Sequence, residues 1–174
     1  MPFTFLIGGA RSGKSSLAVR LASAFDGPVR VVVTAEARDE EMAERIRSHR
    51  AARPAGWETV EAPLELLPAI QGVGEPSCVI LDCLTLWVSN ALEAGDSEDE
   101  IDREARALAS TLAERAAPAI VVSNEVGFGI VPANGLARRY RDVLGRVNGS
   151  LAAQASRSFL VVAGRGLPLE EVTS

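Results

Sequence analysis

Eight residues near the start of the chain have the spacing of a phosphate-binding loop. Residues 8–15 fit the pattern G-x-x-x-x-G-K-[ST]. Gly8 and Gly13 allow the backbone to bend so that successive N–H groups face phosphate oxygens. Lys14, expected to be exposed on the loop, can reach the β- and γ-phosphates of a nucleoside triphosphate, and the Ser15 hydroxyl can bind Mg²⁺. The predicted nucleotide-binding residues are Gly8, Gly9, Ala10, Arg11, Ser12, Gly13, Lys14 and Ser15.

Asp82 is a second candidate for the nucleotide site. It ends an apolar run that begins at Cys78, as the Walker B acid does in P-loop enzymes. In that role its carboxylate would hold Mg²⁺ together with Ser15, directly or through water. The alternative is an Asp that only caps the following helix. The phosphate loop in the same chain favours the metal role.

His49 is the only histidine of the chain, and four arginines lie near it in the sequence. These are Arg45, Arg47, Arg50 and Arg53. A neutral imidazole is a nucleophile, and clustered guanidinium groups suit a polyphosphate. The alternatives are a structural imidazole satisfied by neighbours such as Arg45 or Glu41, and arginines paired with Glu40, Glu41 and Glu44 on a solvated face. Spacing alone does not choose between these interpretations.

Apolar runs and helical spacing predict the elements that position these residues. Strands are expected at residues 3–7, 29–33, 57–62, 78–82, 119–123 and 159–163. Helices are expected at residues 16–24, 39–50, 63–70 and 84–92, in a long stretch that ends near 116, and at 136–157. Residues 164–174 are expected to be a tail. Strands without strict alternation, separated by helices, indicate an α/β fold with a mostly parallel sheet and helices on both faces.

Polar residues follow most of the predicted strands. They are the glycine loop, residues 34–36, Asp82, residues 123–125 and the pair 164–165. Ligands bind at the carboxyl ends of the strands in open α/β sheets. These clusters are therefore expected to form a rim around one site.

Length and composition limit the class of protein. With 174 residues, of which 47% are hydrophobic and 24% charged, residues 1–174 are expected to form one globular domain. A net charge of -5 gives no basic field for nucleic acid, and no apolar run is long enough to span a membrane. The chain enters its first strand at once, which leaves no room for a signal peptide. We therefore expect a cytoplasmic protein without a nucleic-acid or membrane partner.

Several motifs, taken together and in order, resemble the bifunctional cobinamide kinase/cobinamide-phosphate guanylyltransferases of cobalamin biosynthesis. The resemblance begins at residues 8–16 and continues through residues 34–36, 39–42, 45–50 and 53–54, with Trp57. It then includes Leu-Asp-Cys-Leu-Thr at 81–85, Ser-Asn-Glu-Val-Gly at 123–127, Gly-Ile-Val-Pro at 129–132, and residues 141–142 with 145–148. Because it covers nearly the whole chain, the combination is far more specific than the phosphate loop alone.

This resemblance implies a RecA-like P-loop fold and two reactions that use ATP or GTP with Mg²⁺. The enzyme would phosphorylate the aminopropanol hydroxyl of adenosylcobinamide. His49 would then attack the α-phosphorus of GTP, carry GMP, and pass it to the cobinamide phosphate. The resemblance also implies a homotrimer and a corrinoid substrate as partners. Beyond the loop at 8–15, the implied GTP contacts are Thr34, Ala35, Glu36, Arg50, Ala51, Ala52, Arg53, Glu61 and Asp82.

Two other functions use the same residues. A small-molecule kinase without guanylyl transfer would need the phosphate loop and Asp82 but would give His49 no role. A non-catalytic nucleotide switch would transfer nothing, and the chain lacks the N-K-x-D guanine motif of GTPase switches. Covalent retention of α-labelled GTP distinguishes the bifunctional enzyme from both.

Overall fold

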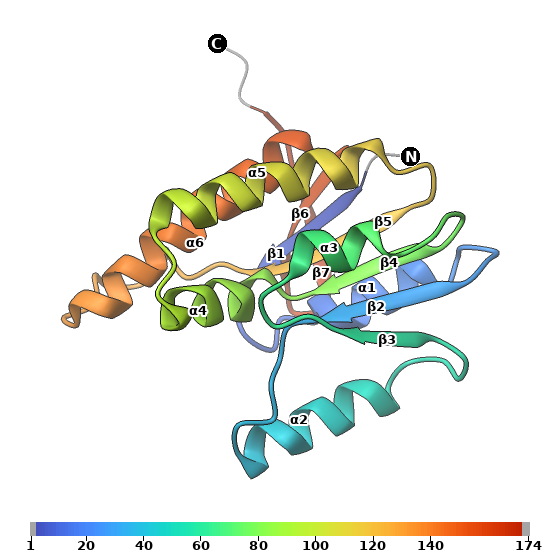
Figure 1. Cartoon of the computed structure of the whole chain (residues 1–174), viewed down its shortest axis with the longest axis horizontal. Coiled ribbons are helices and arrows are strands. Elements are labelled where there is room, and N and C mark those ends of the chain that lie inside the picture. Colours follow the sequence, from blue (N-terminus) through green and yellow to red (C-terminus); the bar gives the residue numbers. More distant parts are fainter. Residues whose placement is uncertain (1–2, 172–174) are drawn as a thin grey trace.

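A seven-stranded sheet forms the centre of the computed structural model, which describes residues 3–171. The strand order is β3-β2-β4-β5-β1-β6-β7, and every neighbouring pair is parallel except β6 and β7 (Figure 1). The strands are β1 (Thr4–Gly8), β2 (Val29–Val33), β3 (Glu58–Glu61), β4 (Cys78–Asp82), β5 (Ala119–Asn124), β6 (Arg157–Val162) and β7 (Arg165–Leu169). The predicted α/β class is confirmed, and the short strand after the arginine-rich helix lies at one edge.

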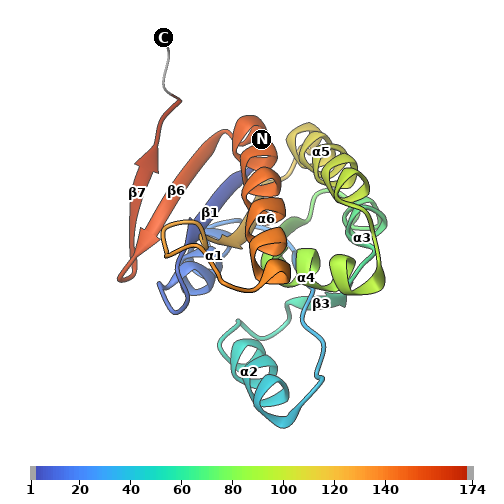
Figure 2. The ribbon, with the colours of Figure 1, turned by 90° about the vertical axis from the view of Figure 1, so that its left-hand side faces the viewer.

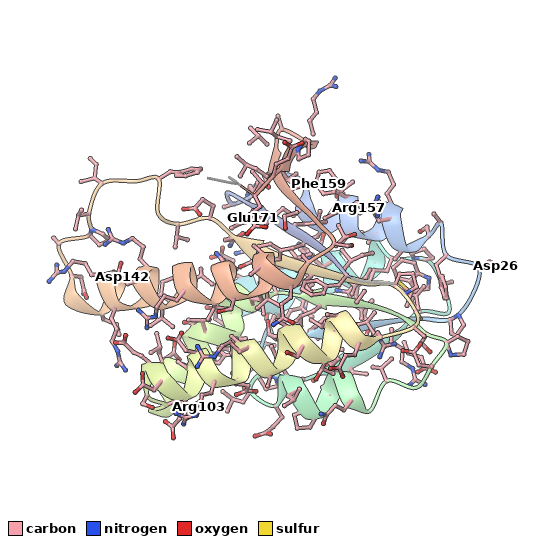
Figure 3. The ribbon with its side chains drawn as sticks, turned by 90° about the horizontal axis from the view of Figure 1, so that it is seen from above. Asp26, Arg103, Asp142, Arg157, Phe159 and Glu171 are labelled. Carbon is pink, nitrogen blue, oxygen red and sulfur yellow. The ribbon has the colours of Figure 1, made fainter. Side chains whose placement is uncertain are left out.

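Residues 3–171 form six helices, and all but α2 pack against the sheet or against the helices that cover it. They are α1 (Lys14–Ala22), α2 (Glu40–Ala51), α3 (Leu66–Gln71), α4 (Leu84–Ala94), α5 (Glu98–Glu114) and α6 (Gly135–Gln154). Helices α3 to α6 cover one face of the sheet and α1 covers the other (Figure 2). Figure 3 shows α5 and α6 side by side, with Arg103 labelled on α5 and Asp142 on α6. No helix within residues 3–171 has the length and apolarity to cross a membrane.

Alternate residues of the central strands enter two separate cores. In β1, Phe5 packs with α3 to α6, whereas the next residue, Leu6, packs with α1. In β4, Leu81 packs with α3 to α6, and Ile80 packs with α1. Both sides of a strand are therefore apolar, which explains why these strands read as continuous hydrophobic runs. Burial on both faces also fixes the register that brings the strand ends to one rim.

The chain after α6 differs from the prediction. Helix α6 ends at Gln154 instead of residue 157, because Ala155 is extended and β6 begins at Arg157, opposite Thr4 of β1. The predicted tail at 164–174 is wrong for residues 165–169, which form β7 against β6. Ala163 and Gly164 make a two-residue turn in which both φ angles are positive, at 50° and 75°. An alanine in that conformation is uncommon, and β7 is exposed throughout, so no alternating pattern indicated the strand.

Helix α2 stands apart from the two packed layers. It projects beyond the β3 edge of the sheet (Figures 1 and 2) and buries none of its residues. Its N-terminus is capped by Asp39, whose carboxylate accepts from the Met42 N–H at 2.7 Å. Two acidic residues in its first turn and two basic residues in its last turn complement the helix dipole. Local interactions therefore stabilise this helix, and little packing against the rest of the fold adds to them.

Candidate active site

The phosphate loop leaves the end of β1, between β5 and β6. A Cβ atom at Gly8 would lie 2.3 Å from the carbonyl oxygen of Val161, so no other residue fits beside β6. Gly13 caps α1 with a φ of 96°, which glycine adopts without strain. Arg11 also has a positive φ, of 56°, and backbone strain of this kind collects at ligand sites. The Gly164 N–H donates to the Ser12 carbonyl at 2.7 Å, so the turn between β6 and β7 braces the loop.

Lys14 lies inside this loop, with its side chain buried. Its Nζ donates to the carbonyl oxygens of Gly8 at 2.9 Å and Gly9 at 2.7 Å, and to the Ser12 hydroxyl at 3.3 Å. The expectation of an exposed lysine is wrong, because Lys14 is the first residue of α1 and the loop folds over it. Burial lowers the pKa of the Lys14 ammonium, while Cys83 and Asp82 oppose that shift.

Five candidate residues line one hollow of about 350 Å³. Ser15 comes from α1, His49 from the last turn of α2, Ala52 and Arg53 from the segment after α2, and Asp82 from the end of β4. The Nδ1 atom of His49 lies 3.8 Å from Oδ2 of Asp82. The side chain of His49 is half exposed and that of Asp82 mostly buried. The structure thus brings the only imidazole to the mouth of the phosphate-loop region.

Asp82 faces this hollow and does not cap a helix. The N-cap of α4 is Cys83, which leaves the Asp82 carboxylate free for the hollow. Ser15 and Asp82 supply a hydroxyl and a carboxylate, and oxygen ligands are those that Mg²⁺ prefers. No group of three or more acidic, cysteine or histidine residues within residues 3–171 forms a metal cage of its own. Two protein oxygens with substrate phosphates and water match the usual way in which Mg²⁺ is held.

The arginines near His49 have different surroundings. Arg47 pairs with Glu40 at 2.8 Å and Glu44 at 2.6 Å, so for this residue the solvated-face interpretation is correct. Arg53 is partly buried, and its Nη1 donates to the Thr59 hydroxyl at 3.4 Å. Burial lowers the pKa of Arg53, against the opposing charge of Asp82. Arg53 is therefore the cation of this group that is placed to meet an anion in the hollow.

Three other predicted contacts, Thr34, Glu36 and Glu61, lie outside that hollow. Thr34 and Glu36 line a second hollow of about 170 Å³, between the segment before α2 and helix α4. The Thr34 hydroxyl donates to the Cys83 carbonyl at 2.7 Å and accepts from the Cys83 N–H at 3.1 Å. Its side chain therefore supports the end of β4. Glu61 ends β3, in register with Val33 of β2, and lies outside both linings.

Some buried polar side chains support the carboxyl ends of the strands, although the sequence analysis assigned them no function. Asn148 of α6 accepts from the Ser123 hydroxyl at 2.6 Å and donates to the Asn124 carbonyl at 3.0 Å. Thr85 of α4 accepts from the Asn124 N–H at 2.9 Å. These contacts fix the carboxyl end of β5 beside the phosphate loop. An asparagine among the apolar positions of a helix was the available signal for Asn148.

The sheet order, the glycine loop after β1 and the acidic end of β4 together define a P-loop NTPase fold. A structure of the assembled ATPase EscN from the type III secretion system of enteropathogenic E. coli matches it with a TM-score of 0.63. The match covers 93% of this chain and 43% of that chain at 10% identity, so it bears on the fold alone. The chain belongs to the CobU family, cobinamide kinase / cobinamide phosphate guanyltransferase, whose model matches residues 4–169.

Curated relatives agree with this family. The bifunctional adenosylcobalamin biosynthesis protein CobP of Pseudomonas aeruginosa is 44% identical over 166 residues, which is 95% of each chain. The bifunctional protein CobU of Salmonella typhimurium is 41% identical over 94% of this chain and 97% of its own. CobU of Escherichia coli is 40% identical over the same shares. The family resemblance inferred from the sequence motifs is confirmed.

Proposed function

We propose that this protein carries out two successive transfers in cobalamin biosynthesis. It phosphorylates the hydroxyl of adenosylcobinamide with ATP or GTP, and it then transfers GMP from GTP to give adenosylcobinamide-GDP. Membership of the family supports the assignment of these two reactions. The observation that carries the mechanism is the single hollow shared by Ser15, His49 and Asp82. We place the enzyme in the cytoplasm and treat residues 1–174 as one catalytic domain.

The first transfer depends on the phosphate loop. Its backbone N–H groups and the N-terminus of α1 bind the triphosphate, and Lys14 places a positive charge on the β- and γ-phosphates. Ser15 and Asp82 would hold Mg²⁺, which neutralises charge on the transferring phosphoryl group. The substrate hydroxyl loses its proton as it attacks the γ-phosphorus, and the bond between that phosphorus and the β-γ bridging oxygen breaks, which releases the nucleoside diphosphate.

The second transfer depends on His49. A ring nitrogen forms a bond to the α-phosphorus of GTP, while the bond from that phosphorus to pyrophosphate breaks. A phosphate oxygen of the cobinamide phosphate then attacks the same phosphorus and returns the electron pair to the imidazole. Arg53, already at the wall of the hollow, is placed to stabilise the departing negative charge. Imidazole is both a good nucleophile and a good leaving group, so one difficult transfer becomes two easier ones.

Two labels on GTP test this proposal. The bifunctional enzyme retains label from the α-phosphate on the protein and releases it to added adenosylcobinamide phosphate. It passes label from the γ-phosphate to adenosylcobinamide. A plain kinase shows only the second transfer, and a nucleotide switch shows neither. Absence of protein-bound α-label under conditions of active phosphorylation would therefore reject the guanylyl transfer.

Asp82→Asn tests the metal role. The change keeps the size of the side chain and removes the charge that would help to hold Mg²⁺. We expect the phosphorylation rate to fall about 100-fold and to recover partly at raised Mg²⁺, because a weakened site fills at higher concentration. Asp99→Asn is the matched control, since it makes the same change in the first turn of α5, outside both hollows. Normal turnover with an unchanged Mg²⁺ dependence would exclude Asp82 as a metal ligand.

We also propose a homotrimer in which a neighbouring subunit completes the corrinoid pocket. The support in the structure is a set of exposed apolar side chains that a monomer leaves in water. They include Phe128, Ile130 and Val131 between β5 and α6, and Leu136 in the first turn of α6. Light scattering is expected to give about three times the chain mass of 18.4 kDa. A fully active species at the mass of one chain would contradict this proposal.

A further inference from the structure

The position of His49 depends on how α2 is attached to the rest of the protein. Because α2 buries none of its residues, core packing does not fix it. Within the described part of the chain, two ion pairs join residues 35–57 to the other elements. One is the contact of His49 with Asp82 itself. The other joins Arg38, just before α2, to Glu93 of α4.

Arg38 makes a fork of contacts at this point. Its Nε and Nη2 atoms donate to Oε2 of Glu36 at 3.1 and 2.6 Å. Nη1 donates to Glu93, and Nη2 also donates to Oδ1 of Asn90 at 3.1 Å. The planar guanidinium therefore connects the segment between β2 and α2 with two residues of α4. A lysine could not reproduce this arrangement, since its ammonium group lacks the fixed fork of donors.

Asn90 lies beneath Arg38 and is almost fully buried. Its Nδ2 donates to the carbonyl oxygen of Thr34 at 3.0 Å and to that of Pro63 at 3.0 Å. Thr34 lies directly after β2, where the chain leaves the sheet toward α2. Pro63 lies just after β3, the strand that follows α2. One side chain of α4 thus holds both ends of the segment that carries His49.

We propose that Arg38 and Asn90 are positioning residues for the guanylyl transfer. They fix both ends of residues 34–63 on α4 and so set where the His49 ring lies relative to Ser15 and Asp82. Neither residue lines the hollow that holds His49, so each acts through the backbone. This inference rests on the proposed role of His49 as the nucleophile.

Loss of the Arg38 contacts should affect the guanylyl transfer and not the phosphorylation. The Arg38 contacts are about half exposed, and exposed ion pairs add little to the stability of a fold. Their loss leaves the phosphate loop, which is built on β1 and α1, in place. A nucleophile displaced by about 1 Å, however, reacts about 100-fold more slowly. Loss of the Arg38 contacts should therefore slow the second transfer and leave the rate of the first transfer unchanged.

Arg38→Ala is the primary test. We expect the maximal rate of protein labelling by α-labelled GTP to fall about 10- to 100-fold. The GTP concentration for half-maximal labelling and the rate of adenosylcobinamide phosphorylation should each change less than about twofold. Arg47→Ala is the matched control, because Arg47 makes its ion pairs within α2 and should leave both rates at the wild-type level.

A charge exchange tests whether the link to α4 is responsible. Arg38→Glu and Glu93→Arg should each slow labelling, and the double variant should regain most of the lost rate. Asn90→Asp keeps the oxygen that accepts from Arg38 but removes the donor to both carbonyls, so it should slow labelling as well. If Asn90→Asp fails to fold, the Arg38 and Glu93 variants still decide the question.

These experiments distinguish failure of the proposed role of His49 from failure of the positioning role of Arg38 and Asn90. If the wild type takes up no covalent label, the role of His49 is wrong and the positioning role falls with it. Normal labelling of Arg38→Ala, with labelled wild type, overturns the positioning role alone. Equal losses of labelling and phosphorylation in Arg38→Ala also overturn it, since they would indicate a general effect on nucleotide binding.

Discussion

Replacement of His49 by alanine is expected to abolish covalent guanylylation of the protein and the transfer of GMP to cobinamide phosphate. The chain contains one imidazole, so no second histidine can substitute for it. Phosphorylation of adenosylcobinamide should persist at a substantial rate, because Lys14, Ser15 and Asp82 remain. Labelling with α-labelled GTP in one assay and γ-labelled GTP in another measures the two activities separately.

The chemistry of the adduct gives a further check on His49. A phosphorus–nitrogen bond to imidazole should be labile in acid and stable in base. Since a lysine adduct can share that lability, peptide mapping of the labelled wild type must place GMP on His49. A covalent GMP adduct on the His49→Ala protein would show that another residue is the nucleophile.

Lys14→Ala is expected to remove both activities. In the proposed mechanism the lysine binds the phosphates that are common to both reactions, and loss of one such charged group costs about 100- to 1,000-fold in rate. Calorimetric titration with GTP should show a large loss of affinity in parallel. Phosphorylation at the wild-type rate by this variant would reject the assignment of the phosphate loop.

Stability provides the control for the lysine variant. Lys14 is buried and donates three hydrogen bonds inside the loop, so its removal leaves the Gly8 and Gly9 carbonyls without that donor. Each lost hydrogen bond costs about 1 kcal/mol of unfolding free energy, and removal of a charge from a buried position offsets part of this. Thermal unfolding should therefore show a folded protein with a slightly lower midpoint. Lys14→Met, which keeps the length of the side chain, should be inactive as well.

The sequence predicted the parts of this molecule that depend on local pattern. The glycine loop, the apolar strands and Asp82 at a strand end follow from residue type and spacing, and the structure places them as expected. Strand β7 was missed because the turn before it places an alanine at positive φ and because the strand has no buried face. Local pattern contains no signal for either feature.

Contacts between distant segments account for the rest of what the sequence did not predict. Asn90 and Arg38 meet across 52 positions, and Asn90 and Thr34 across 56, so no short window contains either pair. Thr34 was expected to contact the nucleotide, and the structure shows its hydroxyl bonded to the backbone of Cys83. The contacts of GTP with Thr34, Ala35, Glu36, Arg50, Ala51, Ala52 and Glu61 remain predictions from the resemblance.

The position of β1 in the sheet bears on when the nucleotide site can form during synthesis. The phosphate loop at residues 8–15 precedes β5 and β6 in the chain, yet β1 lies between these two strands. Ser156 bonds to Phe3 across 153 positions, and the Gly164 turn braces Ser12. Contacts of such long range form late in folding. A nascent chain therefore has its phosphate-binding sequence before β5 and β6 are made, but it completes the loop only after β6 and the following turn have left the ribosome.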